Sequence, residues 1–228
     1  MNFDLYIKTL DAITRLLGVI VWPCVLVFVL VRFSSAIREF ITNIGEFSLK
    51  GGGIDLSAKR KQAEATAALT AAAVSRPENG TTPEIAAQDA REAARIVAAV
   101  ATPRAIRLAE RSAVLWVDDR PNNNIHERQS LEALGITFVI ATSTDEALEK
   151  LKSRTFNAII SDMGRPPDSQ AGYTLLDKLR KAGNQTPYII YAGSRSPEHL
   201  LEAQRRGAVG STNRPNELFG MVLSVLAQ

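Results

Sequence analysis

The C-terminal half of the sequence predicts an α/β fold, a doubly wound sheet of five parallel strands with helices on both faces. Two observations support this prediction. Short apolar runs that fit buried strands alternate with helical stretches throughout residues 112–228. Two of these runs, residues 114–117 and 159–160, are followed within two positions by carboxylates, at the edge where such a sheet binds ligands.

Each strand of this half has a helix after it. Strands are expected near residues 113–118, 136–140, 157–162, 187–191 and 208–212, and helices near residues 123–134, 144–153, 170–182, 196–206 and 215–226. Ser143 or Thr144 can cap the second helix, and Asp145 and Glu146 suit the positive end of its dipole. Right-handed crossovers would then place helices on both faces of the sheet.

Three carboxylates follow two of the expected strands. Asp118 and Asp119 end the first strand, and Asp162 ends the third. Acids brought together at strand ends repel one another unless a divalent cation lies among them, and oxygen ligands of this kind suit Mg²⁺. The sequence therefore predicts a weak Mg²⁺ site, with one carboxylate left to accept a phosphoryl group.

This pattern resembles the receiver domain of bacterial two-component response regulators over residues 112–228. The resemblance implies a flavodoxin-like fold in which Asp118 and Asp119 bind the metal ion and Asp162 is the phosphoacceptor. It also implies that the backbone carbonyl of Gly164 completes the metal site.

The resemblance is incomplete at the positions that respond to phosphorylation. Residues 187–193 and 207–215 match the fourth and fifth strands of the family, which implies switch positions at Tyr191, Ala192 and Arg214. Ala192 replaces the usual Thr or Ser and has no hydroxyl, while Arg214 replaces a Lys with a group of different shape and reach. We therefore expect an interaction surface more than a phosphorylation-driven switch.

The N-terminal part predicts a membrane anchor. Residues 16–31 are uncharged and flanked by Arg15 and Arg32. A span over residues 13–33 reaches the length of about 20 residues that a bilayer requires, if the arginines extend toward the headgroups. A cleaved signal peptide is the alternative, since residues 34–36 are small. The receiver likeness favours a single-pass protein of the bacterial inner membrane with a cytoplasmic C-terminal domain.

Three regions are expected along the chain. Residues 1–49 form the anchor with a juxtamembrane amphipathic helix at 37–47, residues 50–111 form an Ala-rich helical linker, and residues 112–228 form the receiver-like domain. The glycine triplet at 51–53 predicts a hinge before the linker.

The linker predicts helices near residues 57–74, 83–101 and 103–111, the last two capped by Thr82 and Thr102, each followed by Pro. Their thin apolar stripe buries too little by itself. It favours self-association or docking on the receiver-like domain. We expect a homo-oligomer whose contacts lie in the first 111 residues.

Composition narrows the function. Cys24 is the single cysteine, which excludes an internal disulfide, and the net charge of +3 without interleaved aromatic residues gives no support for nucleic-acid binding. Lys59, Arg60 and Lys61 suit either anionic headgroups or solvent. No enzyme motif is present, so we expect no catalytic activity.

The resulting hypothesis is a membrane-anchored signalling or adaptor protein whose receiver-like domain senses or docks a protein partner. Two alternatives stay open. One is a membrane-disrupting effector of a bacterial anti-phage defence system, which the architecture of one span and one soluble domain suggests. The other is a phosphorylatable, membrane-tethered response regulator.

Overall fold

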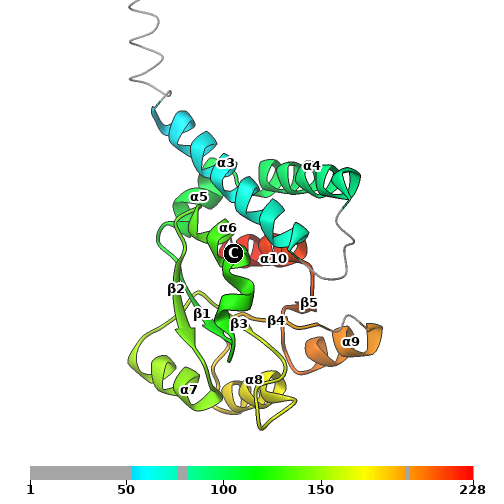
Figure 1. Cartoon of the computed structure of the whole chain (residues 1–228). Helices are drawn as coiled ribbons and strands as arrows, with labels where there is room; N and C mark the ends of the chain where they lie inside the picture. Colours follow the sequence, from blue (N-terminus) through cyan, green and yellow to red (C-terminus); the bar gives the residue numbers. More distant parts are fainter. Residues whose placement is uncertain (1–52, 76–81, 194–195, 228) are drawn as a thin grey trace, which may run out of the picture. The chain divides into compact units, whose positions relative to one another are not determined.

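The computed structural model of the chain describes residues 53–75, 82–193 and 196–227 (Figure 1). The chain divides into two compact units after Asp55, and nearly all of the described residues belong to the second. The expected span at 13–33 and the amphipathic helix at 37–47 lie outside the described residues. None of the helices within the described ranges is both long and apolar enough to cross a membrane.

A parallel sheet of five strands forms the centre of the second unit. The strands are β1 Ala113–Val117, β2 Thr137–Ala141, β3 Ala158–Ser161, β4 Tyr188–Tyr191 and β5 Gly210–Thr212. They pair in the order β2-β1-β3-β4-β5, and every pair is parallel. The predicted doubly wound α/β fold is therefore confirmed, and each expected strand lies within two residues of an observed one.

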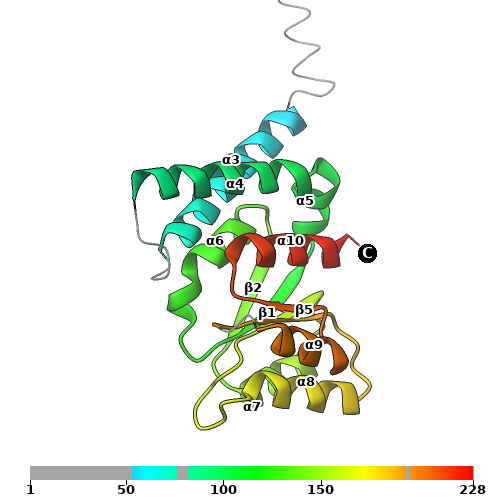
Figure 2. The ribbon, with the colours of Figure 1, turned by 90° about the vertical axis from the view of Figure 1, so that its right-hand side faces the viewer.

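Helices cover both faces of this sheet (Figure 2). A short 3₁₀ helix η2 Pro121–Asn124 leads into α6 Ile125–Glu132, which lies with α10 Pro215–Leu226 on one face; α7 Thr144–Ser153, α8 Ala171–Lys181 and α9 Pro197–Arg205 lie on the other. Strand side chains alternate between the two cores: Trp116 and Ile160 belong to the first, Leu115 and Ile159 to the second. All four are buried, which explains why the central strands are apolar throughout.

Three further helices precede the sheet in the chain: α3 Gly53–Val74, α4 Pro83–Val100 and α5 Pro103–Ala109. Of these, α4 and α5 pack on α10. Leu69 of α3 and Val97 of α4 belong to the same buried cluster as Phe219 of α10. The Gln62 side-chain amide of α3 also donates a 2.7 Å hydrogen bond to the carbonyl of Ala101, which ties α3 to the end of α4.

The starts of α4 and α5 follow the predicted capping pattern. The Thr82 hydroxyl accepts a hydrogen bond from the Ile85 N–H at 3.4 Å, and the Thr102 hydroxyl accepts one from the Ala105 N–H at 3.2 Å. Val97 and Ile106 of the predicted apolar stripe are buried in the cluster that includes α10, while Ile85 stays exposed, so docking within the chain accounts for part of the stripe. The buried part of the stripe therefore gives no separate reason for self-association.

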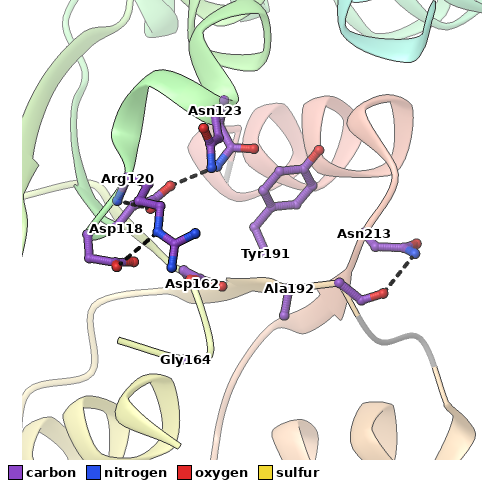
Figure 3. A pocket seen from close by; sticks show the side chains of 11 residues that line it. Asp118, Arg120, Asn123, Asp162, Gly164, Tyr191, Ala192 and Asn213 are labelled. Atoms are coloured by element: carbon purple, nitrogen blue, oxygen red, sulfur yellow. Dashed lines mark hydrogen bonds and ion pairs between the residues drawn. The ribbon is translucent and has the colours of Figure 1, made fainter. Parts of the chain in front are cut away.

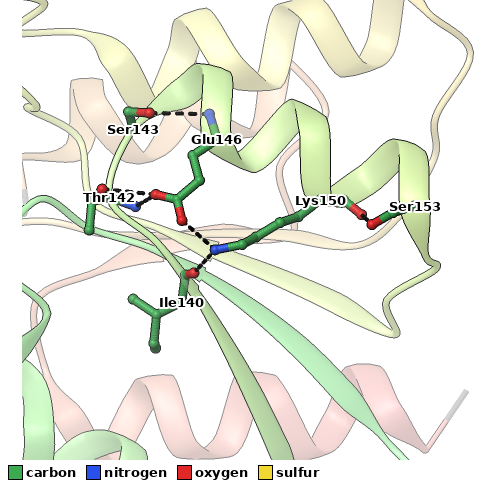
Figure 4. A network of polar contacts seen from close by, with 6 residues as sticks. All are labelled: Ile140, Thr142, Ser143, Glu146, Lys150 and Ser153. Carbon is green, nitrogen blue, oxygen red and sulfur yellow. Dashed lines mark hydrogen bonds and ion pairs between the residues drawn. The ribbon is translucent and has the colours of Figure 1, made fainter.

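The start of α7 is fixed by a reciprocal cap directly after β2 (Figure 4). The Ser143 hydroxyl accepts from the Glu146 N–H at 3.1 Å, and the Glu146 carboxylate accepts from the Thr142 N–H at 2.7 Å. Lys150 contacts both Glu146 and the Ile140 carbonyl. The hydrogen bond from Lys150, followed by those from Thr142, lowers the pKa of Glu146 to about 2.

The packing of α3 on the rest of the unit can be tested by truncating one buried leucine. Leu69 is fully buried, so Leu69→Ala should lower the free energy of unfolding by on the order of 2–5 kcal/mol, measured by urea denaturation with circular dichroism. Leu56 on the same helix is 72% exposed, so Leu56→Ala is the matched control and should cost little. Equal effects of the two substitutions would show that α3 does not pack on this unit.

Candidate functional site

The pairing of β1 with β3 brings the three predicted acids together. Val117 at the end of β1 lies opposite Ser161 at the end of β3. Asp118 and Asp162 follow at the same edge of the sheet, and Asp119 is next along the chain. Each of the three acids has a carboxylate oxygen within 4.8 Å of the others' oxygens. Figure 3 shows Asp118 and Asp162 facing the same hollow.

Asp118 is the most firmly held of the three acids. It is 3% exposed, and its carboxylate accepts three hydrogen bonds. The donors are the backbone N–H of Arg120 at 2.8 Å, the side-chain amide of Asn124 at 2.7 Å and the indole N–H of Trp116 at 3.3 Å. A buried carboxylate that accepts this many hydrogen bonds is fixed in one orientation.

Asp162 lies in a less favourable environment. Burial raises the pKa of its carboxyl group, and the charges of Asp118 and Asp119 raise it further. The hydrogen bond from the Met163 N–H, at 2.6 Å, and the charge of Arg165 oppose that increase in pKa. Burial first, and then repulsion from the other two acids, therefore makes the charged form of Asp162 unfavourable.

A hollow of about 350 Å³ opens over the acids (Figure 3). Six of the predicted site residues line it: Asp118, Asp119, Asp162, Gly164, Tyr191 and Ala192. Five residues that the sequence reasoning did not single out also line it: Arg120, Asn123, Asn124, Gly193 and Asn213. Arg120 directly follows the acid pair, so its position in the chain could have indicated it. Its guanidinium Nε lies 3.5 Å from a carboxylate oxygen of Asp119.

Arg214 does not line this hollow. Its side chain is 61% exposed, and its guanidinium lies 3.8 Å from the carboxylate of Glu217 at the start of α10. The preceding residue, Asn213, lines the hollow instead and donates a 3.3 Å hydrogen bond to the Gly193 carbonyl. Among the described residues that line the hollow, the single cation is thus Arg120 and not the arginine that the sequence resemblance indicated.

Tyr191 and Ala192 differ in environment although they are adjacent. The Tyr191 ring is buried against Trp116, with 6.0 Å between ring centroids, and its hydroxyl donates to Glu127 at 2.8 Å. Ala192 is half-buried at the rim of the hollow and has no polar side-chain atom. A Cβ built on Gly193 would meet no atom within 4 Å, so this rim is open.

Arg165 is a buried cation that no sequence pattern indicated. It is 3% exposed and lies behind the Asp162 backbone, where it donates to the Asp162 carbonyl at 2.6 Å and to the Ser161 hydroxyl at 2.7 Å. A second branch donates to the Ala171 carbonyl at 2.9 Å. Arg165 therefore joins the end of β3 to the start of α8. Gly172 permits this approach, because a Cβ there would lie 2.9 Å from the Asp162 carbonyl oxygen.

A doubly wound sheet in the order 2-1-3-4-5, with clustered acids at one edge, defines a flavodoxin-like α/β domain. Comparison with known families agrees. Residues 114–221 match the family described as the response regulator receiver domain. Residues 114–221 therefore form a receiver-like domain, the kind of domain that functions in signalling.

Two sensor proteins are similar to parts of the chain. The virulence sensor protein BvgS of Bordetella pertussis is 33% identical over 117 residues, which cover 50% of this chain and 9% of BvgS. The sensor protein EvgS of Escherichia coli is 30% identical over 82 residues, which cover 36% of this chain and 7% of EvgS. The matched segments thus span less than a tenth of either sensor protein.

Solved structures of receiver proteins are also similar. The Francisella response regulator 1452 receiver domain is 25% identical with a TM-score of 0.46, and the match covers 51% of this chain and 96% of that one. The chemotaxis response regulator CheY4 of Vibrio cholerae is 27% identical with a TM-score of 0.44, and the match covers 50% of this chain and 98% of that one.

The unfavourable environment of the Asp162 carboxylate predicts an unusual response to substitution. Burial and the neighbouring acids raise the pKa of Asp162 in the folded state, so its ionised form is unfavourable at neutral pH. The free energy of unfolding of the metal-free protein should therefore increase as the pH falls through that pKa. Asp162→Asn should therefore raise the melting temperature in a metal-free buffer at neutral pH.

Asp168 is the matched control. Its pKa is lowered, first by the hydrogen bond from Thr174 and then by that from the Gln170 N–H, so its contribution to stability is lost as the pH falls through its own pKa. Asp168→Asn should lower the melting temperature at neutral pH. Calorimetry of both variants checks the two signs, and a destabilised Asp162→Asn would contradict the proposed repulsion.

Proposed function

We propose that this chain is a membrane-anchored signalling or adaptor protein whose receiver domain docks a protein partner and does not switch on phosphorylation. The observation that carries the proposal lies at the rim of the hollow. Ala192 stands where a hydroxyl would be needed to hold a phosphoryl oxygen, and the side chain of Arg214 points away. A new anion on Asp162 would therefore meet neither of those two donors.

The acid cluster itself fits Mg²⁺. Asp118, Asp119 and Asp162 would hold the ion, with Gly164 beside them in the hollow. When bound, the ion supplies positive charge that offsets the repulsion among the carboxylates. Binding should be weak because the carboxylate of Asp118 already accepts three internal hydrogen bonds and Arg120 lies near Asp119. In this proposal the chain is not an enzyme, and the ion has a structural role.

The surface next to β4 and β5 supports partner docking. β5 is the last strand of the sheet, and α9 packs against it. Leu201 on α9 is 55% exposed, and Val209, directly before β5, is 43% exposed. Exposed large apolar side chains next to a sheet edge suit a protein partner and not a nucleic acid.

The membrane part of the proposal rests on residues 16–31. They are uncharged and flanked by arginines, which favours a single-pass protein of the bacterial inner membrane. Because a receiver domain takes part in signalling by cytoplasmic kinases, we place the C-terminal domain in the cytoplasm. Self-association through the first 111 residues stays part of the proposal, now centred on the segment before α3.

A second candidate function is a phosphorylatable, membrane-tethered response regulator. The intact acid triad favours it, because metal ion and phosphoacceptor would then lie side by side. Asp162 also faces an open hollow that a small phosphodonor could enter.

The anchor predicts how the protein fractionates. The full chain should stay in the membrane pellet after a wash in high salt, because burial of an apolar span does not depend on charge screening. A chain that begins at Gly53 should be soluble. Recovery of the full chain in the salt supernatant, measured by immunoblotting, would refute the membrane anchor.

The missing hydroxyl can be restored. Ala192→Thr should allow beryllofluoride with Mg²⁺, a mimic of aspartyl phosphate, to cause NMR chemical-shift changes that reach Tyr191 and α9. In the unmodified chain the changes should stay near Asp162. Ala192→Val is the control because valine has the shape of threonine without the hydroxyl, and it should behave like the unmodified chain.

The same experiment separates the two candidate functions. If the unmodified chain already carries a stable aspartyl phosphate, with shift changes that extend to α9, the docking proposal is wrong and the second candidate function holds.

A further inference from the structure

Three exposed arginines lie on α5 and on the turn that follows it. Arg104 and Arg107 lie on α5 three residues apart, and Arg111 lies two residues after the end of the helix. Ile106 and Ala109 of the same helix are buried. None of the three arginines forms an ion pair with another described residue.

The first turns of α3 extend this charge. Lys61 of α3 bonds to Glu110 at 2.5 Å, which places α3 beside the end of α5, and both ribbon views show the two helices side by side (Figures 1 and 2). Residues 56–64 and 102–112 together contain six basic and two acidic side chains. This net charge of four exceeds the +3 of the whole chain, so positive charge is concentrated here.

The pKa of Glu110 is affected by this positive charge. Its pKa is lowered first by the hydrogen bond and charge of Lys61 and then by the charges of Arg111 and Arg107. Three cations thus act on one carboxylate, and that carboxylate is already paired.

An exposed apolar residue accompanies the charge. Leu56 is 72% exposed, the most exposed of the large apolar side chains described, and it precedes Lys59 and Arg60 by one turn. A large apolar side chain beside several cations is the pattern of a surface that lies in the headgroup region of a bilayer. Neither α3 nor α5 has an aromatic side chain on which a nucleobase could stack.

Chain connectivity keeps this surface near the proposed anchor. The expected span ends at residue 33 and α3 begins at Gly53. Even fully extended, the ~20 intervening residues reach no further than ~70 Å. A tether of this length raises the effective concentration of the surface at the bilayer.

We infer that the basic surface formed by Leu56, Lys59, Arg60, Arg104, Arg107 and Arg111 lies against the anionic phospholipid headgroups of the membrane that holds the anchor. This inference rests on the proposed membrane anchor. Each cation near an anionic bilayer strengthens binding by about fivefold, so removing Arg104, Arg107 and Arg111 together should weaken docking by roughly 100-fold.

The test uses the full chain reconstituted into phosphatidylcholine vesicles, with or without phosphatidylglycerol. An environment-sensitive fluorophore is attached at Ser57→Cys, an exposed position of α3, in a Cys24→Ala background. The fluorophore emission should shift to the blue in the anionic vesicles alone. Raising the salt concentration from about 0.1 M to about 1 M should reverse the shift, because the screening length falls from ~10 Å to ~3 Å.

One triple variant and one double variant test the assignment. Arg104→Gln, Arg107→Gln and Arg111→Gln together should abolish the shift, whereas Arg91→Gln with Arg95→Gln, which removes exposed arginines from α4, should retain it. Equal emission in both vesicle types, or an unchanged shift in the triple variant, overturns the inference.

Vesicle flotation in high salt reports separately on the anchor. A chain that floats with neutral vesicles but shows no anionic response retains its anchor and refutes the basic surface. A chain that fails to float with neutral vesicles, yet binds anionic ones through Arg104, Arg107 and Arg111, refutes the anchor and supports the surface. Binding of duplex DNA without any response to anionic vesicles also overturns the inference.

Discussion

Mutual repulsion among three carboxylates is the constraint around which the rest of the site is arranged. Because β1 and β3 pair in parallel, Asp118 and Asp162 lie at the same edge of the sheet. Carboxylate oxygens of all three acids lie within 4.8 Å of one another. The surrounding groups reduce that repulsion. Asp118 is held by three donors, Arg120 lies beside Asp119, and the guanidinium of Arg165 lies behind the Asp162 backbone.

The same constraint joins the acid edge to the apolar core. Trp116 donates its indole N–H to Asp118 while its ring lies fully buried in the core beneath α6 and α10. The guanidinium of Arg128 lies 5.6 Å from the centre of this ring. Leu69 and Val97 of the helical layer belong to the same cluster. The hydrogen bond between Trp116 and Asp118 therefore connects the charged acids directly to the core cluster that contains residues of α3 and α4.

Sequence reasoning predicted the sheet and the acid triad because both depend on short-range patterns. Strand periodicity and the rule that parallel strands end at one edge are local, and they placed Asp118 and Asp162 correctly. The resemblance to the receiver family placed Arg214 at a switch position, but at the start of α10 its side chain points outward. The sequence did not indicate Arg165, because no sequence motif identifies a buried cation that is held by carbonyl and hydroxyl groups.

The helical layer shows a different limit. The sequence indicated an apolar stripe on the helices before the sheet but could not choose between a second copy and the same chain, since both would bury equal surface. The structure supplies α10 as the partner, with Phe219 in the cluster that includes Val97 and Ile106. The choice depends on the shape of α10 after folding, which no local pattern encodes.

The environment of Tyr191 supports the proposal that additional charge at Asp162 causes no wider conformational change in this domain. The ring is 5% exposed, lies edge-on to Trp116 and has its hydroxyl bonded to Glu127 at 2.8 Å. Moving it would break a buried hydrogen bond and uncover aromatic surface, both unfavourable. A hydroxyl at position 192 could offset that cost by binding the new anion, and alanine offers none. Under the proposed docking function, the inward, hydrogen-bonded position of Tyr191 stays the stable one when the acid edge carries additional charge.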